Sequence, residues 1–325
     1  MPNLRNQLLA LLLQHKESFL SGEKISEQLQ VSRTAIWKHI EALRQEGYQI
    51  EARPRSGYRL IYQPDRLGPE EILPHLTTRR FGHAIRYERS LPSTQPYAHQ
   101  WAREGAQEGA LVIADEQTAG RGRLGRRWIA PAGAGIWMSL ILRPPIPLAY
   151  ASQLTLVASV GISQGISDYT GLSLGIKWPN DLLIANKKVC GILTELRGEQ
   201  DRVDYVILGI GINVNLKREQ LPEELQEKVT SLSMASGKDY SRRELLLAIL
   251  VALENIYDLY LKEGFEPIRT LWEQEARIQG RKIVASTPQG TITGTAIGLD
   301  KNGSLLLQCD DRITPLYSAE IQYST

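Results

Sequence analysis

The sequence has little of what metal, redox and membrane proteins usually need. Its two cysteines, Cys190 and Cys309, lack the spacing of a zinc site, and its five histidines are scattered. We therefore expect two idle thiols in a reducing compartment. The first residues lack the pattern of a signal peptide, and the most apolar stretch, residues 154–166, is short for a membrane span and interrupted by polar residues. These absences favour a cytoplasmic protein.

Two common phosphate-binding patterns are absent or incomplete. No Gly-x-x-x-x-Gly-Lys-Ser/Thr run occurs, which excludes a P-loop. Residues 120–125 fit Gly-x-Gly-x-x-Gly, but a dinucleotide-binding turn must open directly into a helix. Here residues 129–135 follow, and their proline and glycines rule out a helix, so we reject a dinucleotide site. The net charge of +2 does not indicate a nucleic-acid binder either, so such a role must depend on local charge.

With 325 residues, the chain is too long for one typical domain. Its predicted strands do not alternate strictly with helices, which favours an α+β multidomain protein over a doubly wound sheet. A polar connector rich in proline and glycine marks the first boundary. We predict a winged helix–turn–helix at 1–63, a linker at 64–69, a central α/β domain with a mixed sheet at 70–274, and a small SH3-like β-barrel at 275–325.

The N-terminal segment has the order of elements of a winged helix–turn–helix. A helical stripe of leucines comes first, Ser21 can cap a second short helix, and Ser32 can cap a third that ends at Gly47. Two short strands, 49–51 and 58–62, then enclose a basic loop. In this motif the third helix enters the major groove of DNA.

Local charge supports contact between this segment and DNA. Residues 1–63 contain nine Lys and Arg against six Asp and Glu, more basic than the chain as a whole. The alternative is a structural helical domain with solvated charges. Trp37 either packs under the wing or touches DNA. Our candidates for DNA contact are Arg33, Thr34 and Lys38 on the third helix and Arg53 and Arg55 on the wing.

The central segment mixes both element types. Ser241 and Glu244 form a capping box that starts a long helix, and Gly264 ends it. The remaining apolar patterns predict helices at 95–104, 150–170 and 242–263 and strands at 111–115, 136–142, 174–178, 181–184, 189–195 and 205–211. From about residue 276, short strands alternate with turn signals, which is typical of a small antiparallel barrel.

Three runs carry the chemistry. Residues 120–128, Gly-Arg-Gly-Arg-Leu-Gly-Arg-Arg-Trp, combine a pliable backbone with guanidinium groups that fit carboxylate and phosphate oxygens. The alternatives are a solvated basic loop and a nucleic-acid-binding patch. Residues 177–182, Lys-Trp-Pro-Asn-Asp-Leu, place a lysine at a strand end beside a proline-restricted turn. Residues 209–215 alternate glycine with isoleucine and end in amides, so a ligand can lie against the backbone.

All three runs in this order resemble the biotin–protein ligases. Residues 190–195, Cys-Gly-Ile-Leu-Thr-Glu, add to the resemblance, and the N-terminal segment makes the chain similar to the bifunctional class, the biotin operon repressors. The likeness spans essentially the whole chain. It implies that biotin contacts Ser93, Thr94, Gln117, Arg121, Gly122, Arg123 and Lys177. The chain departs from the family pattern at Gln95, which replaces asparagine, and at Leu124, where arginine is common.

The resemblance also implies a reaction. The biotin carboxylate attacks the α-phosphorus of ATP to give biotinyl-5′-adenylate and diphosphate, and a lysine of the biotin carboxyl carrier protein then takes the biotin. Two anions must meet, so Arg121, Arg123 and Lys177 are the catalytic candidates, with Mg²⁺ bound to ATP and no metal site on the protein itself. Our candidates for contact with ATP and the adenylate are Arg126, Trp128, Asn180, Asp181 and Asn213.

The predicted repressor implies further partners. One winged helix holds a half-site too weakly, so we expect a homodimer on palindromic operator DNA, favoured by the bound adenylate. Three alternatives remain open: a lipoate–protein ligase, a ligand-sensing repressor without ligase activity, and a ligase whose winged helix no longer reads DNA.

The arginine loop leads to a first prediction. Arg123→Ala should slow adenylation on the order of 10²-fold or more, because one donor to the developing charge is lost. Single-turnover formation of biotinyl-adenylate and biotin binding measure the effect. Unchanged rate and affinity would contradict the assignment.

Overall fold

The computed structural model describes residues 4–15, 18–199, 202–287 and 290–323. Within these ranges, no helix combines the length and the apolar character needed to cross a membrane. The chain divides into two compact units. The first unit comprises residues 1–66 and 70–74, and the second comprises residues 67–69 and 75–325.

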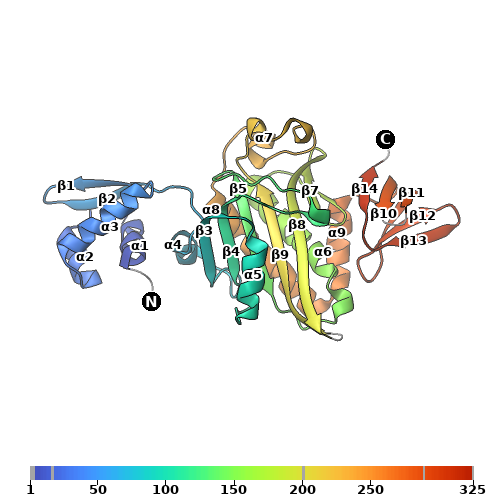
Figure 1. The fold of residues 1–325 in the computed structure, drawn as a ribbon, viewed down its shortest axis with the longest axis horizontal. Coiled ribbons are helices and arrows are strands. Elements are labelled where there is room, and N and C mark those ends of the chain that lie inside the picture. The colour runs from blue at the N-terminus through green and yellow to red at the C-terminus, as the bar shows by residue number, and fades with distance from the viewer. Residues whose placement is uncertain (1–3, 16–17, 200–201, 288–289, 324–325) are drawn as a thin grey trace. The chain divides into compact units, whose positions relative to one another are not determined.

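The first unit is a helix–turn–helix followed by a hairpin, as predicted (Figure 1). The Ser21 hydroxyl accepts from the backbone N–H of Lys24 (3.1 Å), and Ser32 accepts from Ala35 (3.2 Å), so both predicted caps form. The apolar faces of the helices meet in a core that excludes water. The elements are α1 (Leu4–Gln14), α2 (Gly22–Leu29), α3 (Arg33–Gln45), β1 (Gln49–Arg53) and β2 (Gly57–Tyr62).

The chain just beyond the hairpin also packs on the first unit. The short helix α4 (Pro69–Ile72) places Glu71 in a buried position, where the Tyr48 hydroxyl donates to its carboxylate. Burial raises the pKa of Glu71. Arg5 pairs with Glu70 at 3.1 Å. Residues 70–74 therefore group with the helix–turn–helix and not with the domain that follows them.

The second unit is built on a seven-stranded mixed sheet with the order β3-β4-β5-β9-β8-β7-β6. Only β3 and β4 pair in parallel, and the other neighbours are antiparallel. All eight residues of β5 are buried, which marks the centre of the core. The strands are β3 (Ile85–Leu91), β4 (Leu111–Gln117), β5 (Gly135–Leu142), β6 (Gly175–Lys177), β7 (Asp181–Ile184), β8 (Lys187–Glu199) and β9 (Arg202–Asn213).

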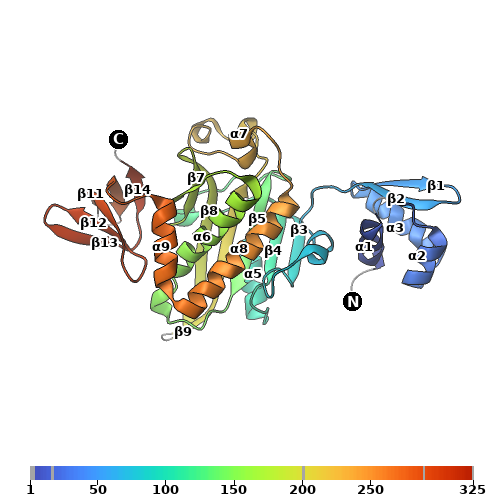
Figure 2. The same cartoon turned by 180° about the vertical axis from the view of Figure 1, so that it is seen from behind.

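Helices cover both faces of this sheet. One face carries α5, and the other carries α6, α8 and α9 (Figure 2). The expected strands and helices all form, with small shifts of their ends. The sequence patterns missed β3, α7 and α9. The helices are α5 (Thr94–Arg103), α6 (Gln153–Thr170), α7 (Leu232–Ser236), α8 (Arg242–Glu263) and α9 (Phe265–Ala276).

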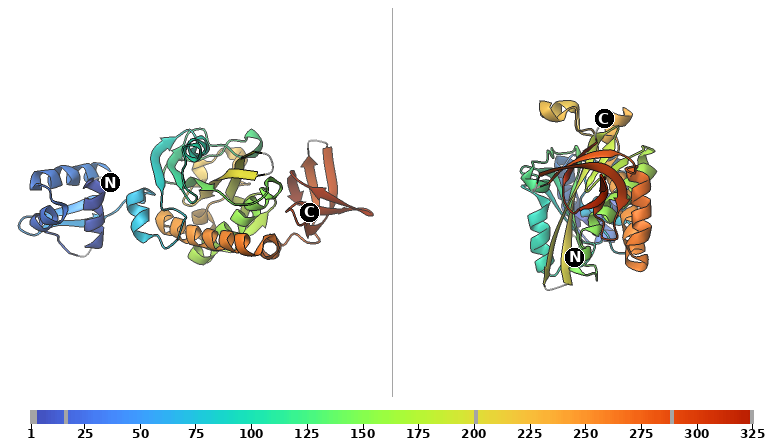
Figure 3. Two further views of the ribbon diagram at one scale, coloured as in Figure 1. Left: turned by 90° about the horizontal axis from the view of Figure 1, so that it is seen from below. Right: turned by 90° about the vertical axis from the view of Figure 1, so that its right-hand side faces the viewer.

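The C-terminal strands form a curved antiparallel sheet instead of a closed barrel (Figure 3). Their order is β13-β12-β11-β10-β14, and within the described residues no ladder joins β13 to β14. Because the edge strands β13 and β14 do not pair within the described residues, the sheet is open. The expected SH3-like barrel is therefore corrected to an open five-stranded sheet. The strands are β10 (Lys282–Thr287), β11 (Gly290–Leu299), β12 (Leu305–Cys309), β13 (Arg312–Leu316) and β14 (Glu320–Tyr323).

The turn between β11 and β12 joins this sheet to the central domain. Gln153 on α6 donates to the backbone carbonyl of Lys301 at 2.9 Å. The Trp178 indole N–H donates to the carbonyl of Gly303 at 3.3 Å, in a buried position. These bonds place the C-terminal sheet beside the turn that follows Lys177.

Two glycines allow α6 and α8 to pack closely. A Cβ added at Gly161 would lie 2.7 Å from the Cα of Leu253, and one at Gly165 would lie 2.7 Å from the Cα of Ile249. Gly165→Leu should therefore lower the free energy of unfolding by about 1–3 kcal/mol, because the helices must separate. Thermal and denaturant unfolding measure this. The control Asp168→Ala, on the exposed face of the same helix, should change little, and equal effects would contradict the prediction.

Candidate functional site

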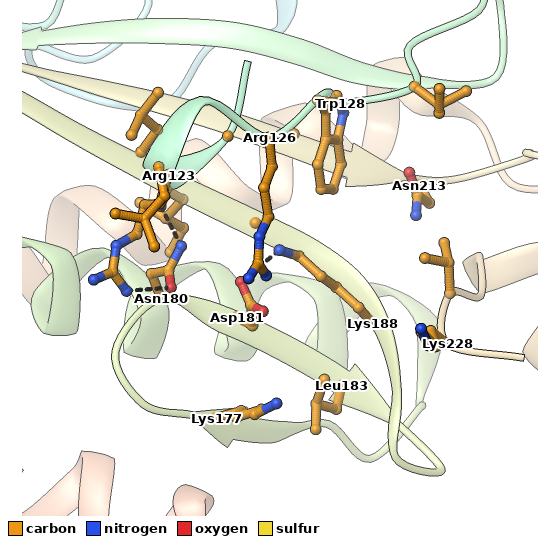
Figure 4. Close-up of a pocket in the computed structure, with 18 of the residues that line it drawn as sticks. Arg123, Arg126, Trp128, Lys177, Asn180, Asp181, Leu183, Lys188, Asn213 and Lys228 are labelled. Carbon is orange, nitrogen blue, oxygen red and sulfur yellow. Dashed lines mark hydrogen bonds and ion pairs between the residues drawn. The ribbon is translucent and has the colours of Figure 1, made fainter. Parts of the chain in front are cut away.

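A cavity of about 780 Å³ opens on the central sheet (Figure 4). Its lining comes mainly from the start of α5, the end of β4, the arginine loop 120–128, strand β5, the turn after β6, strands β7, β8 and β9, the segment 216–229 and strand β14 of the C-terminal sheet. A cavity of this size suits a small molecule together with a nucleotide. Segments far apart in the sequence thus meet at one site.

One wall of the cavity is a buried polar network. The Gln117 amide oxygen accepts from the Thr94 backbone N–H at 2.8 Å. The hydroxyls of Thr94 and Ser139 lie 2.7 Å apart, and Ser139 donates to the Gln95 amide oxygen at 3.3 Å. Gln95 in turn donates to the carbonyl of Leu193 at 3.0 Å. The longer side chain at position 95 is thus part of this network.

The arginine loop is a tight hairpin in which no regular helix follows the glycines. The Gly122 N–H donates to the carbonyl of Arg126 at 2.7 Å, and the Trp128 N–H donates to Gly120 at 2.9 Å. Leu124 sits at the tip with φ +56° and is 81% exposed. The rejection of a dinucleotide-binding turn is confirmed, because the chain runs from this loop into β5.

Two loop arginines have partners across the cavity. Arg123 donates to the Asn180 amide oxygen at 3.1 Å and to the Ser318 hydroxyl at 2.8 Å. Arg126 binds the Glu320 carboxylate with both terminal nitrogens, one of them at 2.9 Å. The C-terminal sheet therefore holds the loop through residues 318 and 320.

Burial and ion pairing shift the pKa values of the charged groups that join the arginine loop to the C-terminal sheet. Burial lowers the pKa of Arg123, whereas the bond to Glu320 raises the pKa of Arg126. The pKa of Glu320 is lowered, chiefly by its hydrogen bonds from Arg126. A carboxylate with a lowered pKa loses its favourable charge as pH falls through that value, so the tie between loop and sheet is present at neutral pH and weakens in acid.

Lys188 is a lining residue that the sequence analysis missed. Its ammonium lies 2.6 Å from the Asp181 carboxylate and 5.3 Å from the centre of the Trp128 ring (Figure 4). The antiparallel pairing of β7 with β8 brings it there, since Leu183 lies opposite Lys188. In the sequence it is one of two adjacent lysines, and only the strand register shows which one faces the cavity.

The strand glycines leave room for neighbouring side chains. The Trp128 indole covers Gly211, where an added Cβ would come within 2.6 Å of the ring. The Gln95 side chain covers Gly209 in the same way, at 2.9 Å. Both glycines also line the cavity, and the contact of a ligand with the backbone of residues 209–215 stays a prediction. The buried Trp128 N–H has no acceptor among the described residues.

The structure gathers every predicted biotin and nucleotide residue around the one cavity. Asn213 is 2% exposed, and its amide already donates to the carbonyl of Thr230 at 3.0 Å. The assignment of each residue to biotin or ATP stays a prediction. The residues are Ser93, Thr94, Gln117, Arg121, Gly122, Arg123, Arg126, Trp128, Lys177, Asn180, Asp181 and Asn213.

The predicted DNA-contact residues lie on the surface of the first unit. Arg33, Thr34 and Lys38 are exposed on α3, and the Arg33 side chain is 72% exposed. On the wing, Arg55 is exposed in the turn, whereas Arg53 stacks over the Phe19 ring at 4.6 Å and pairs with Glu51. Arg53 is thus partly occupied by contacts within the unit.

Models of known protein families match the N-terminal, central and C-terminal segments of the chain separately. A model of the biotin/lipoate A/B protein ligase family matches residues 87–213, a helix–turn–helix domain model matches residues 4–59, and a model of the biotin protein ligase C-terminal domain matches residues 279–323. Together they define a protein-ligase domain that carries a helix–turn–helix.

Individual relatives narrow the class. The bifunctional ligase/repressor BirA of Bacillus spizizenii is 50% identical over 98% of both chains, and that of Escherichia coli is 32% identical over 97% of this chain and 95% of its own. A solved structure of the Aquifex aeolicus biotin protein ligase with biotin and ATP has a TM-score of 0.65 and 31% identity, over 74% of this chain and 99% of its own. The chain belongs to the family of bifunctional biotin–protein ligases and repressors.

The packing of Trp128 on β9 leads to a test of the cavity. Gly211→Ala should displace the indole, because the new Cβ overlaps the ring. We expect a changed tryptophan emission and a loss of ATP affinity of about tenfold, equivalent to roughly 1.4 kcal/mol. Gly175→Ala, at a position with open space around it, is the matched control. An unchanged emission and affinity in Gly211→Ala would refute the proposed contact.

Proposed function

We propose that this chain joins biotin to a carrier-protein lysine by way of biotinyl-5′-adenylate, and that its first unit represses transcription in response to that adenylate. One observation carries the enzymatic part: a single cavity combines a buried amide and hydroxyl wall with a cationic side. Biotin has the matching parts, a polar ureido ring and a carboxylate that must meet a phosphate.

The polar wall supplies both donors and acceptors. Hydroxyls can donate and accept, and an amide side chain offers one oxygen and an NH₂ group. Ser93, Thr94 and Gln117 would bind the ureido ring, whose oxygen accepts and whose N–H groups donate. Because Thr94 is bound to both Gln117 and Ser139, the side chains of Thr94 and Gln117 are oriented before the ligand arrives.

The cationic side would hold the two anions together. Arg121, Arg123, Lys177 and Lys188 all face the cavity, and their charges offset the repulsion between the biotin carboxylate and the α-phosphate. Mg²⁺ would arrive with ATP and neutralise its phosphates, and the Asp181 carboxylate pairs with the Lys188 ammonium at 2.6 Å. Trp128 and Asn213 would contact the nucleotide.

The second half of the reaction requires that water be excluded from the site. A mixed anhydride is destroyed by water, so the arginine loop must cover it until the acceptor lysine attacks. The amine forms the amide bond with the biotin carbonyl carbon, and AMP leaves with the electrons of the broken carbon–oxygen bond. No side chain of this chain needs to form a covalent intermediate.

Lys188 can be tested against its neighbour. Lys188→Ala should reduce adenylate formation on the order of 10²-fold, because one preorganised cation is removed. The matched control is Lys187→Ala, because Lys187 is not among the described residues that line the cavity, although its partner Glu227 is. Single-turnover kinetics with labelled ATP measure both. Equal rates for the two variants would remove Lys188 from the proposed mechanism.

The decisive assay is transfer of labelled biotin to a biotin carboxyl carrier domain, with and without ATP. ATP-dependent labelling, blocked by replacing the acceptor lysine with arginine, is the expected result. Lipoate serves as competitor, and incorporation of lipoate in place of biotin would overturn the substrate assignment. Tight biotin binding without transfer would indicate a sensor without ligase activity.

For repression, we propose a homodimer on palindromic operator DNA, promoted by the adenylate. Analytical ultracentrifugation should show a shift toward dimer when biotin and ATP are added together, because the ligand favours the state that it binds more tightly. Biotin alone and ATP alone are the controls. Association that does not depend on the ligands would refute this switch.

A further inference from the structure

Trp37 stands apart from the other tryptophans of the chain. It is 54% exposed, whereas each of the other five is buried or partly buried. An indole buries a large apolar area when it finds a partner, so leaving half of it in water forgoes a substantial stabilisation. The exposed indole is therefore available for contact with a partner molecule of the first unit.

The position of Trp37 in α3 shows what would cover it. The inner face of α3 is formed by the buried residues Ile36, Ile40 and Leu43. Trp37 lies on the outer side, one turn after Arg33 and next to Lys38, both of them exposed. The exposed indole thus shares the outer side of α3 with two cations, in the first half of the helix that faces the major groove in this motif.

Phe19 is the aromatic side chain that contacts the wing arginines. The guanidinium groups of Arg53 and Arg59 lie over its ring, at 4.6 and 4.7 Å from the ring centre. Tyr58, on β2, packs against the core of the unit. Trp37 is 54% exposed, so the alternative in which it packs under the wing is not the arrangement observed.

We propose that Trp37 is a specificity-determining residue that lies against the 5-methyl group of a thymine in the major groove. The inference rests on the proposed DNA-binding function of the first unit. The thymine methyl is the apolar feature of the major groove, and it is absent from the other three bases. Arg33 and Lys38 would bind phosphates on either side, which sets the register of the helix but carries no sequence information.

The two kinds of contact differ in their response to salt. A contact between a cation and a phosphate releases counterions, so its loss lowers the dependence of affinity on salt concentration. A contact between indole and methyl releases none. Trp37 should therefore change which sequences are bound without changing the salt dependence, and Lys38 should do the reverse.

The test uses the full chain with biotin and ATP present. Wild-type protein first selects duplexes from a random-sequence library, and the enriched duplex is then the probe for wild type, Trp37→Ala, Trp37→Phe, Lys38→Ala and Gln45→Ala. Gln45 is exposed near the end of the same helix and serves as the matched control. Each thymine of the probe is replaced singly by uracil, which removes only the methyl group.

We expect Trp37→Ala to bind the selected duplex roughly five- to tenfold more weakly, the size of one lost base contact. One uracil position should weaken wild type by a similar factor and leave Trp37→Ala unaffected. Trp37→Phe should keep part of the sensitivity, and Gln45→Ala all of it. Lys38→Ala should lower the slope of log affinity against log salt by about one.

Three outcomes would overturn the proposal. Trp37→Ala could bind as wild type does, it could keep the full uracil penalty at every position, or it could lose affinity equally on all sequences. Thermal unfolding and biotin transfer by the same variants show whether the chain is intact. If wild type enriches no duplex at all, the DNA-binding function itself fails, and this result is distinct from a failure of Trp37 alone.

Discussion

Several cationic side chains lie close together in the cavity of this protein, and the site depends on the groups that offset the repulsion between them. Arg123, Arg126, Lys177 and Lys188 all face one cavity. Asn180, Asp181 and Glu320 hold three of these cations by hydrogen bonds or ion pairs. The cations are therefore oriented before any ligand is bound, which lowers the cost of organising the site during the reaction. The same carboxylates must share their cations with the anionic substrates, so the loop that carries Arg126 can respond to what the cavity contains.

The central sheet provides the rigid platform that this arrangement needs. Gly209 and Gly211 lack side chains, so Gln95 and Trp128 can lie directly on strand β9. The polar wall of the cavity and its aromatic surface are thus positioned by the same strand. Close packing of α6 on α8 supports the opposite face of the sheet. A substitution at Gly209 or Gly211 would alter the cavity without touching a charged group.

The C-terminal sheet belongs to the site as well as to the fold. Its strand β14 carries Glu320, which binds the arginine loop, and the turn after β11 accepts a hydrogen bond from Trp178. Both contacts are made to segments that carry predicted catalytic residues, namely the arginine loop and the turn after Lys177. Removal of this sheet would release the loop and the Lys177 turn together, so the C-terminal domain and the ligase domain form one functional unit.

The sequence by itself determined the helix–turn–helix, most strands and helices of the central domain, and the three motifs whose residues line the cavity. These features depend on local signals, such as the caps at Ser21 and Ser32, hydrophobic periodicity and glycine-rich runs. Only the tertiary structure decided that Lys188 faces the cavity, that Trp128 covers Gly211 and that Glu320 holds Arg126. Each of these contacts joins residues brought together by strand register or domain packing. Such long-range pairing leaves no periodic trace in a single sequence, because it is set by which strands become neighbours.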